Sequence, residues 1–236
     1  MKNAVVALAA WVCIALPAAA HPGQNETPKT TKEERAVSPY HNIKVNGPFE
    51  VTLVSGTAGT LTLKGETGML SQITTTVTDG TLSITLAEGY TLPEKKHVEI
   101  TVPFETMNRI DLVGNGCINI DKTIKTDVKV TVDGCGTISL KTASANVEAW
   151  VLGPGQLKIK GSADIFTCKI IGCGSVQGYD LEAKNVTAQI SGPGAIEIDC
   201  TKAITGKING NGSISFTGNP AEKDLKRSGS GEFTML

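Results

Sequence analysis

The chain has 236 residues, of which 40% are hydrophobic, 19% are charged and only 4% are aromatic. Its formal net charge of -1, from 22 basic and 23 acidic residues, excludes a strongly basic nucleic-acid-binding protein. Glycine occurs 26 times, well above the usual frequency of roughly 7%. Because each glycine inside a helix costs roughly 0.5–1 kcal/mol, this composition favours strands and turns.

The first twenty residues have the composition of a secretory signal peptide. Lys2 gives a positive start, and the apolar run that follows is short and rich in alanine, unlike a membrane-spanning helix. Ala18 and Ala20 provide the small residues that signal peptidase requires, so we expect cleavage after Ala20. The sequence therefore predicts export to the periplasm, the cell surface or the extracellular space. It predicts no transmembrane segment in the processed chain.

Residues 21–37 are rich in proline, threonine, lysine and glutamate and have no apolar period, so we predict a flexible linker. Residues 38–107 then contain short alternating segments typical of strands. Asp79 and Gly80 lie between two such segments and are a strong signal for a hairpin turn. We expect this strand and hairpin region to begin or cover the structure formed by the rest of the chain.

From residue 108 to residue 236 the sequence repeats a Gly-x-Gly element seven times, at spacings of 18 to 20 residues. The first glycines of these elements are Gly114, Gly134, Gly153, Gly172, Gly192, Gly210 and Gly229. A fixed period of this kind indicates a repeat architecture, in which each unit stacks on the previous one.

Alternation around these glycines indicates the local structure. Positions two before and four after the first glycine are apolar in almost every repeat, as at Leu112, Ile118, Val151 and Leu157. The positions between them are mostly polar, and a period of two is typical of strands with one buried face. The glycines share the parity of the buried positions. We therefore expect them at bends, where a side chain would collide with the opposite wall or where φ is positive.

A period near 19 residues is too short for a βαβ unit, which needs roughly 30. It suits one coil of a solenoid whose coils stack about 4.8 Å apart. We therefore predict an all-β fold, a right-handed parallel β-helix (β-solenoid) of about seven coils over residues 108–236, preceded by the N-terminal strand and hairpin region. An antiparallel sandwich with glycine-rich hairpins is the alternative, because short strands at regular spacing also suggest sandwiches.

The order of these segments resembles the bacterial family described as "putative auto-transporter adhesin, head GIN domain". The resemblance is carried by IKVNGPFEVTL at 43–53, TDGTLSITL at 78–86, VEITVPFETMNRIDLVGNG at 98–116 and the later Gly-x-Gly coils. It spans roughly residues 38–236. The resemblance implies an exported all-β protein built on parallel β-helix coils, with adhesion or surface interaction as its role and no catalytic motif.

Five cysteines remain after the expected cleavage, and they give little support for a redox or metal site. They are Cys117, Cys135, Cys168, Cys173 and Cys200. Cys135 and Cys173 share one column two coils apart, about 9.6 Å, which is too far for a disulfide. A bridge between Cys117 and Cys135 would require distortion, and Cys168 falls in a buried column, where we expect it to pack as a small hydrophobe.

No catalytic, cofactor or metal site is predicted. All three histidines precede the coils, so a histidine-based nucleophile or zinc site would lack partners there. Carboxylates do not stand together in the outward columns five residues before and five residues after the first glycine, and a polysaccharide lyase or hydrolase would need such a cluster on neighbouring coils. We interpret these columns as a solvated polar surface.

One outward feature is apolar and is the candidate site for a ligand or partner. Trp150, Leu152 and Pro154 have outward parity in one coil, and Ile171 has it in the next. Tryptophan on a β-surface is a common platform for sugar rings or partner proteins. An exposed apolar patch also calls for a cover, which the front strands, a second copy of the chain or a ligand would provide.

The sequence therefore predicts an exported, non-enzymatic adhesin-like module that binds a protein or glycan at the cell envelope. Two alternatives stay open. A carbohydrate-active enzyme on a β-helix rests on fold analogy. A structural envelope protein would self-associate through its ends or its apolar patch.

Overall fold

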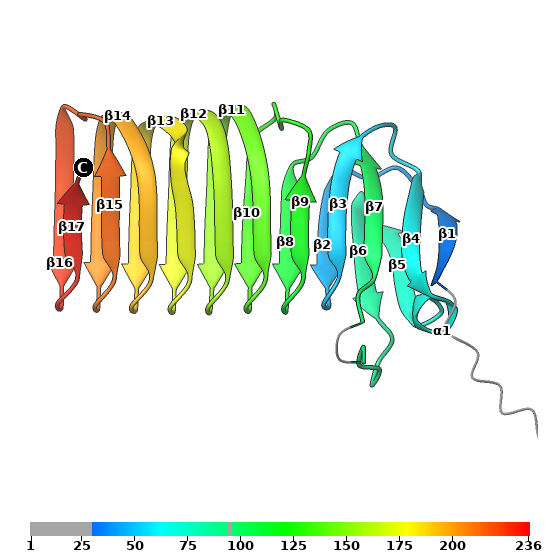
Figure 1. Cartoon of the computed structure of the whole chain (residues 1–236). Helices are drawn as coiled ribbons and strands as arrows, with labels where there is room; N and C mark the ends of the chain where they lie inside the picture. Colours follow the sequence, from blue (N-terminus) through cyan, green and yellow to red (C-terminus); the bar gives the residue numbers. More distant parts are fainter. Residues whose placement is uncertain (1–29, 94–95) are drawn as a thin grey trace, which may run out of the picture.

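The computed structural model describes residues 30–93 and 96–236 (Figure 1). The predicted signal peptide and residues 21–29 of the predicted linker lie outside these residues. Strands make up 68% of these residues and helices 2%. Successive coils pair in parallel, so the predicted β-solenoid of about seven turns is confirmed and the antiparallel sandwich is excluded.

The front strands are β1 (Thr30–Ala36), β2 (Asn42–Asn46), β3 (Glu50–Ser55), β4 (Thr60–Glu66), β5 (Ile73–Thr78), β6 (Thr81–Leu86) and β7 (Glu99–Phe104). The repeat strands are β8 (Arg109–Val113), β9 (Cys117–Ile120), β10 (Val128–Asp133), β11 (Thr137–Leu152), β12 (Gln156–Ile171), β13 (Ser175–Ser191), β14 (Ala195–Asn209), β15 (Ser213–Thr217), β16 (Glu222–Ser228) and β17 (Glu232–Met235). One helical turn, α1 (Thr67–Leu70), follows β4. Across the described segments, no helix has the length and apolarity needed to cross a bilayer.

Each coil contributes one strand to each of two walls (Figure 1). The first wall holds the strands that lead into the Gly-x-Gly turns, and the second wall holds the strands that leave them. The long strands β11 to β14 begin in the second wall, bend round a broad corner and end in the first wall. Figure 1 shows the tight turns along one edge of the solenoid and the broad corners along the other.

The inward columns predicted from the alternation form one continuous core between the walls. Ile110 and Val130 stack in the first wall, Ile118 and Ile138 stack in the second, and all four are 0% exposed. Cys168 is also 0% exposed and packs as a small hydrophobe, as expected. Burial of apolar surface, at about 25 cal/mol per Å², is the main stabilising contribution to such a core.

The two glycines of each turn are required for different reasons. The first glycine has a positive φ in all seven turns, between 92° and 122°, a region where any other side chain is strained. The second glycine has no room for a side chain. A Cβ atom at Gly136 would lie 2.6 Å from Cδ2 of Leu112 and 2.7 Å from the carbonyl oxygen of Gly116. Both reasons expected from the sequence therefore apply: a positive φ at the first glycine and the lack of room for a side chain at the second.

The front strands begin the solenoid and then extend it beyond its first coil. β2 pairs in parallel with β8, and β3 pairs in parallel with β9. The turn that joins β2 to β3 contains Gly47 at φ 140°. β6 and β7 stack on the other side of β2 and β3, again in parallel. The chain therefore runs out to the end of the solenoid and returns past its own first coil to begin β8.

Antiparallel strands complete this end of both walls. β5 pairs with β6 through the predicted hairpin, whose turn has Asp79 at φ 49° and Gly80 at φ 68°. In the second wall, β4 pairs with β7, and β1 pairs with β4 as the outermost strand.

The linker prediction is wrong for residues 30–36, because these residues form β1. Their sequence, TTKEERA, has no apolar period, but the backbone pairs with β4 over the full length of the strand. Arg35 fixes the strand further by donating from Nη2 to the carbonyl oxygen of Leu70 at 2.7 Å and from Nη1 to that of Ile73 at 2.5 Å.

We predict that valine at a first turn glycine destabilises the fold, and by different amounts at two sites. At Gly153 a Cβ atom would lie 3.4 Å from its nearest neighbour, so strain at φ 92°, roughly 1–3 kcal/mol, is the expected cost. At Gly192 a Cβ atom would lie 2.6 Å from the carbonyl oxygen of Gly172, which adds overpacking of roughly 1–3 kcal/mol. Chemical denaturation should give Gly192→Val a lower free energy of unfolding than Gly153→Val. Pro154→Ala, which changes the residue between the two turn glycines, is the control. Melting within a degree of the wild type for both valine variants would contradict this account.

We also predict that Arg35→Ala loosens β1 without unfolding the solenoid. The substitution leaves two carbonyl groups without their charged donor, and hydrogen bonds to charged groups contribute roughly 1.5–3 kcal/mol. Hydrogen exchange should therefore accelerate in residues 30–36 and leave β11 to β14 unchanged. Lys32→Ala is the matched control, because the ion pair of Lys32 within the described residues is with exposed Glu34, at 3.2 Å. Equal exchange in both variants would show that Arg35 does not hold the strand.

Candidate binding surface

Trp150 lies on the outer surface of the first wall. It belongs to β11 and is in register with Thr131 of β10 and Lys169 of β12. The Nζ atom of Lys129 lies 4.1 Å from the centroid of the Trp150 ring, and that of Lys169 lies 5.5 Å from it. Both distances are within the range of about 6 Å over which an aromatic ring attracts a cation. The half-buried ring is therefore flanked by two ammonium groups.

The front strands do not cover this patch, so the expectation that they provide its cover is wrong. They extend the walls at the end of the solenoid, beyond β2 and β3. In the first wall, β8 and β10 separate β2 from β11, which carries Trp150. The physical reason is that the unpaired backbone at the end of a solenoid needs partners, and the front strands provide them.

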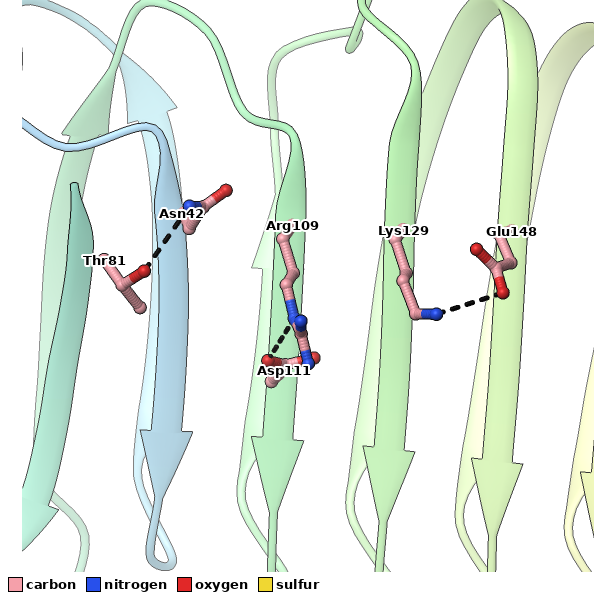
Figure 2. A network of polar contacts seen from close by, with 6 residues as sticks. All are labelled: Asn42, Thr81, Arg109, Asp111, Lys129 and Glu148. Atoms are coloured by element: carbon pink, nitrogen blue, oxygen red, sulfur yellow. Dashed lines mark hydrogen bonds and ion pairs between the residues drawn. The ribbon is translucent and has the colours of Figure 1, made fainter. Parts of the chain in front are cut away.

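Polar contacts follow the same outer surface of the first wall (Figure 2). Lys129 donates from Nζ to Glu148 at 3.0 Å, and Arg109 donates from Nε to Asp111 at 2.7 Å. Oδ1 of Asp111 is buried and has no hydrogen-bond partner among the described residues. Lys169 forms no ion pair within the described part of the chain, so its charge is available to a ligand.

A groove of about 560 Å³ adjoins the lysine–tryptophan cluster on the side of the broad corners. It is lined by Asn108, Asp127, Val128, Lys129, Asn146, Val147, Glu148, Ile165 and Thr167. Asp127 accepts hydrogen bonds from the backbone N–H and the side-chain Nδ2 of Asn146, both at 2.8 Å. These bonds lower the pKa of Asp127, so this carboxylate stays ionised. The exposed side chain of Ile165 adds an apolar wall.

The other residues of the predicted patch lie nearer the tight turns. Leu152 follows Trp150 on the same surface and is in register with Ile171, whose side chain is 44% exposed. Pro154 is exposed at the tip of its turn. Trp150 therefore belongs with the lysines and the groove, whereas Leu152, Pro154 and Ile171 form an apolar strip along the tight-turn edge.

Lys129, Glu148, Lys169 and Ile165 were not predicted as site residues. Their signal was present in the repeat. Counting by the spacing of the first glycines places Lys169 in the column of Trp150 in the next coil, as the register confirms. The distance of each ammonium group from the ring depends on side-chain conformation, which the spacing does not determine.

The five described cysteines are all free thiols, and the strained bridge between Cys117 and Cys135 does not form. Burial raises the pKa of the Cys168 and Cys200 thiols, and burial followed by the charge of Glu50 raises that of Cys117. In residues 30–93 and 96–236, no group of three or more histidine, cysteine or acidic side chains could hold a metal ion.

Comparison with solved structures supports the fold. A putative adhesin from Bacteroides fragilis is 24% identical, with a TM-score of 0.80 over 88% of this chain and 97% of its own. A putative adhesin from Parabacteroides distasonis is 19% identical, with a TM-score of 0.71 over 89% of this chain and 98% of its own. A putative lipid binding protein from the same species is also 19% identical, with a TM-score of 0.66 over the same shares. No curated protein matches the sequence.

The sequence itself matches a family model over residues 39–220, which takes in β2 to β15. The match spans both walls and the surface around Trp150. The chain therefore belongs to the family described as "Putative auto-transporter adhesin, head GIN domain".

Proposed function

We propose that this protein is a non-enzymatic adhesin-like module of the cell envelope that binds an acidic glycan on the outer surface of the first wall. The observation that carries the proposal is the Trp150 ring between Lys129 and Lys169, beside a groove of about 560 Å³. Membership of an adhesin family supports binding rather than catalysis. The side chains project from register-locked strands, so the surface is preorganised for a ligand.

An acidic ligand follows from the charges in the column of Trp150. From β2 to β16 this column reads Lys44, Asp111, Thr131, Trp150, Lys169, Gln189, Lys207 and Lys226. It contains four lysines and one acidic residue, spaced by coils about 4.8 Å apart. A linear array of cations suits an extended polyanion, whose repeated charges contact successive coils.

A glycan is favoured over an acidic protein segment by the groove. Asn108, Asn146 and Thr167 line it with amide and hydroxyl groups, which hydrogen-bond sugar hydroxyls in both directions. Trp150 adds the aromatic surface against which a sugar ring packs. The ammonium groups over the ring add attraction for the carboxylate or sulfate groups of an acidic sugar.

The carboxylates of the groove do not support the alternative of a glycoside hydrolase. Such an enzyme needs one carboxyl group that stays protonated to donate to the leaving group. The two hydrogen bonds from Asn146 lower the pKa of Asp127, which favours the ionised form. Glu148 accepts a hydrogen bond from the Lys129 ammonium at 3.0 Å, so its side chain is already engaged by a neighbouring cation. Neither group is placed to act as a general acid.

We predict that Lys169→Ala weakens binding of an acidic glycan about 10-fold, equivalent to about 1.4 kcal/mol. Trp150→Ala should weaken binding at least as much. Because the ring is only half-buried, the Trp150→Ala substitution should lower the free energy of unfolding by less than the roughly 3 kcal/mol expected for a buried tryptophan. The measurement is a glycan array with paired acidic and neutral glycans, followed by calorimetry on the best acidic ligand. Raising the ionic strength should weaken this binding further.

The matched control is Lys158→Ala, which removes an exposed lysine from the second wall. It should leave binding unchanged. A preference for neutral glycans, equal losses in Lys158→Ala and Lys169→Ala, or binding only to acidic peptides would each contradict the proposal. Release of reducing sugar from a bound glycan would show an enzyme instead.

A further inference from the structure

The tight-turn edge of the solenoid differs from the rest of the surface in its charge. Each of the six turns from Gly114 to Gly210 has three edge residues: the residue before the first glycine, the residue between the glycines and the residue after the second. Among all of these, Asp133 alone is charged. The broad-corner edge carries ion pairs instead, such as Lys160 with Asp180 at 2.9 Å. Depletion of charge is the mark of the buried core of a protein–protein interface.

Two thiols stand on this edge, where charged residues are few. Cys135 and Cys173 are exposed turn-tip residues, both free, with the exposed tip residue Pro154 between them. Leu152 and the 44% exposed Ile171 lie directly beside them on the first wall. The edge therefore combines an apolar strip with two reactive groups, placed symmetrically about one proline.

The turn tips lie in line, because the turns bond to one another. The N–H of Gly134 donates to the carbonyl of Leu152, and that of Gly153 donates to the carbonyl of Ile171, both at 2.9 Å. Cys135 and Cys173 are thus two coils apart, about 9.6 Å. Because a disulfide needs Cα atoms no more than about 6.8 Å apart, the two cannot bond within one copy.

We propose that two copies of this chain dock edge to edge in antiparallel orientation, joined by reciprocal disulfides. A two-fold axis through Pro154, perpendicular to the walls, places Cys135 of each copy opposite Cys173 of the other. One docking event therefore brings both pairs together, as isologous contacts require. The same axis places Leu152 against Leu152 of the second copy.

The parallel arrangement, with the two-fold axis along the solenoid, is less favourable. It would pair each cysteine with its own equivalent. It would also set the apolar side of the edge, at Leu152 and Ile171, against the polar side at Gln156 and Ser175. The antiparallel arrangement sets Leu152 against Leu152 and places Asp133 of each copy opposite Ile171 of the other, so its apolar contact is centred on the Leu152 pair.

The chemistry is thiol–disulfide exchange with a disulfide-bearing oxidant, which exported proteins encounter. For each bond, two S–H groups lose their protons to water and one S–S bond forms between the copies. The oxidant disulfide takes up the two electrons and two protons from water, and it leaves as two thiols. Cys117 is less suited to take part, because it is half-buried on the flank of its turn and its thiol pKa is raised.

The dimer would change how a ligand is bound. An axis perpendicular to the walls leaves both first walls facing the same way, so two Trp150 surfaces would lie side by side. A ligand long enough to reach both would bind the second surface intramolecularly, which raises avidity. The dimer itself does not depend on any ligand, so its test is separate from that of the glycan.

The test oxidises the purified protein with oxidised glutathione and follows covalent dimers by non-reducing electrophoresis and peptide mass spectrometry. The wild type and the control Cys117→Ser should form a dimer that reductant dissolves. Cys135→Ser alone and Cys173→Ser alone should each remain monomeric. Mixing these two variants should restore a dimer, linked through the one remaining pair, Cys173 of one with Cys135 of the other.

Each other outcome overturns the proposal. Dimers formed by either single variant alone would show the parallel arrangement. A monomeric wild type, or one with a bridge between Cys117 and Cys135, would show that the edge does not self-associate. Failure of the mixed variants to form a dimer would show that the pairing is not reciprocal. Unchanged thermal melting of the serine variants checks that each is folded.

Discussion

Close contact between the backbones of neighbouring Gly-x-Gly turns is the constraint on which the rest of this structure depends. Each turn donates an N–H to the next, as from Gly134 to Leu152 and from Gly153 to Ile171. The approach leaves no space for a Cβ atom at the second glycine, as at Gly136. Because the turns are fixed against one another, the coils stack in register, and the register brings Trp150 beside Lys169. The arrangement of the outer surface is therefore decided at glycines that no ligand touches.

The packed interior leaves recognition to the outer surfaces, and these differ from one another in chemistry. The first wall carries Trp150 in a column that also contains four lysines, the tight-turn edge has few charged residues, and the broad corners carry ion pairs. Such separation is possible because inward and outward positions alternate strictly along each strand. A substitution at an outward position can change what the surface binds while the core column beside it is unaffected.

The repeat made much of the fold predictable. The parity of Leu112, Ile118 and their equivalents identified the buried columns, because burial on one side of a strand imposes a period of two. β1 could not be predicted in this way. Its residues have almost no apolar side chains, and the strand is held by backbone pairing with β4 and by Arg35, which donates to carbonyl groups far away in the sequence. Because β1 is held by backbone pairing and not by burial of one face, its sequence shows no apolar alternation from which a strand could be predicted.

The candidate site was predictable only in part. The outward parity of Trp150 follows from its buried neighbours on the same strand. The front strands leave Trp150 uncovered because β6 and β7 stack at the end of the solenoid. Alternation within a strand does not specify which strand lies next to that strand, so this placement could not be predicted. The groove beside Trp150 depends on the paths of β10 to β12 near the broad corner, where the coil register later shifts between Lys158 and Gly161. Repeat spacing is least informative where the coils differ in length.

The return of the chain past its own first coil has a consequence for the order of folding. β2 pairs with β6 and β8, and β3 pairs with β7 and β9, all of which follow them in the sequence. Closing such long loops before any contact forms is entropically costly. β12, β13 and β14 instead each add to the coil just completed, so folding can propagate along them one coil at a time. The segment synthesised first must therefore wait for partners made later, whereas each later coil finds its template already in place.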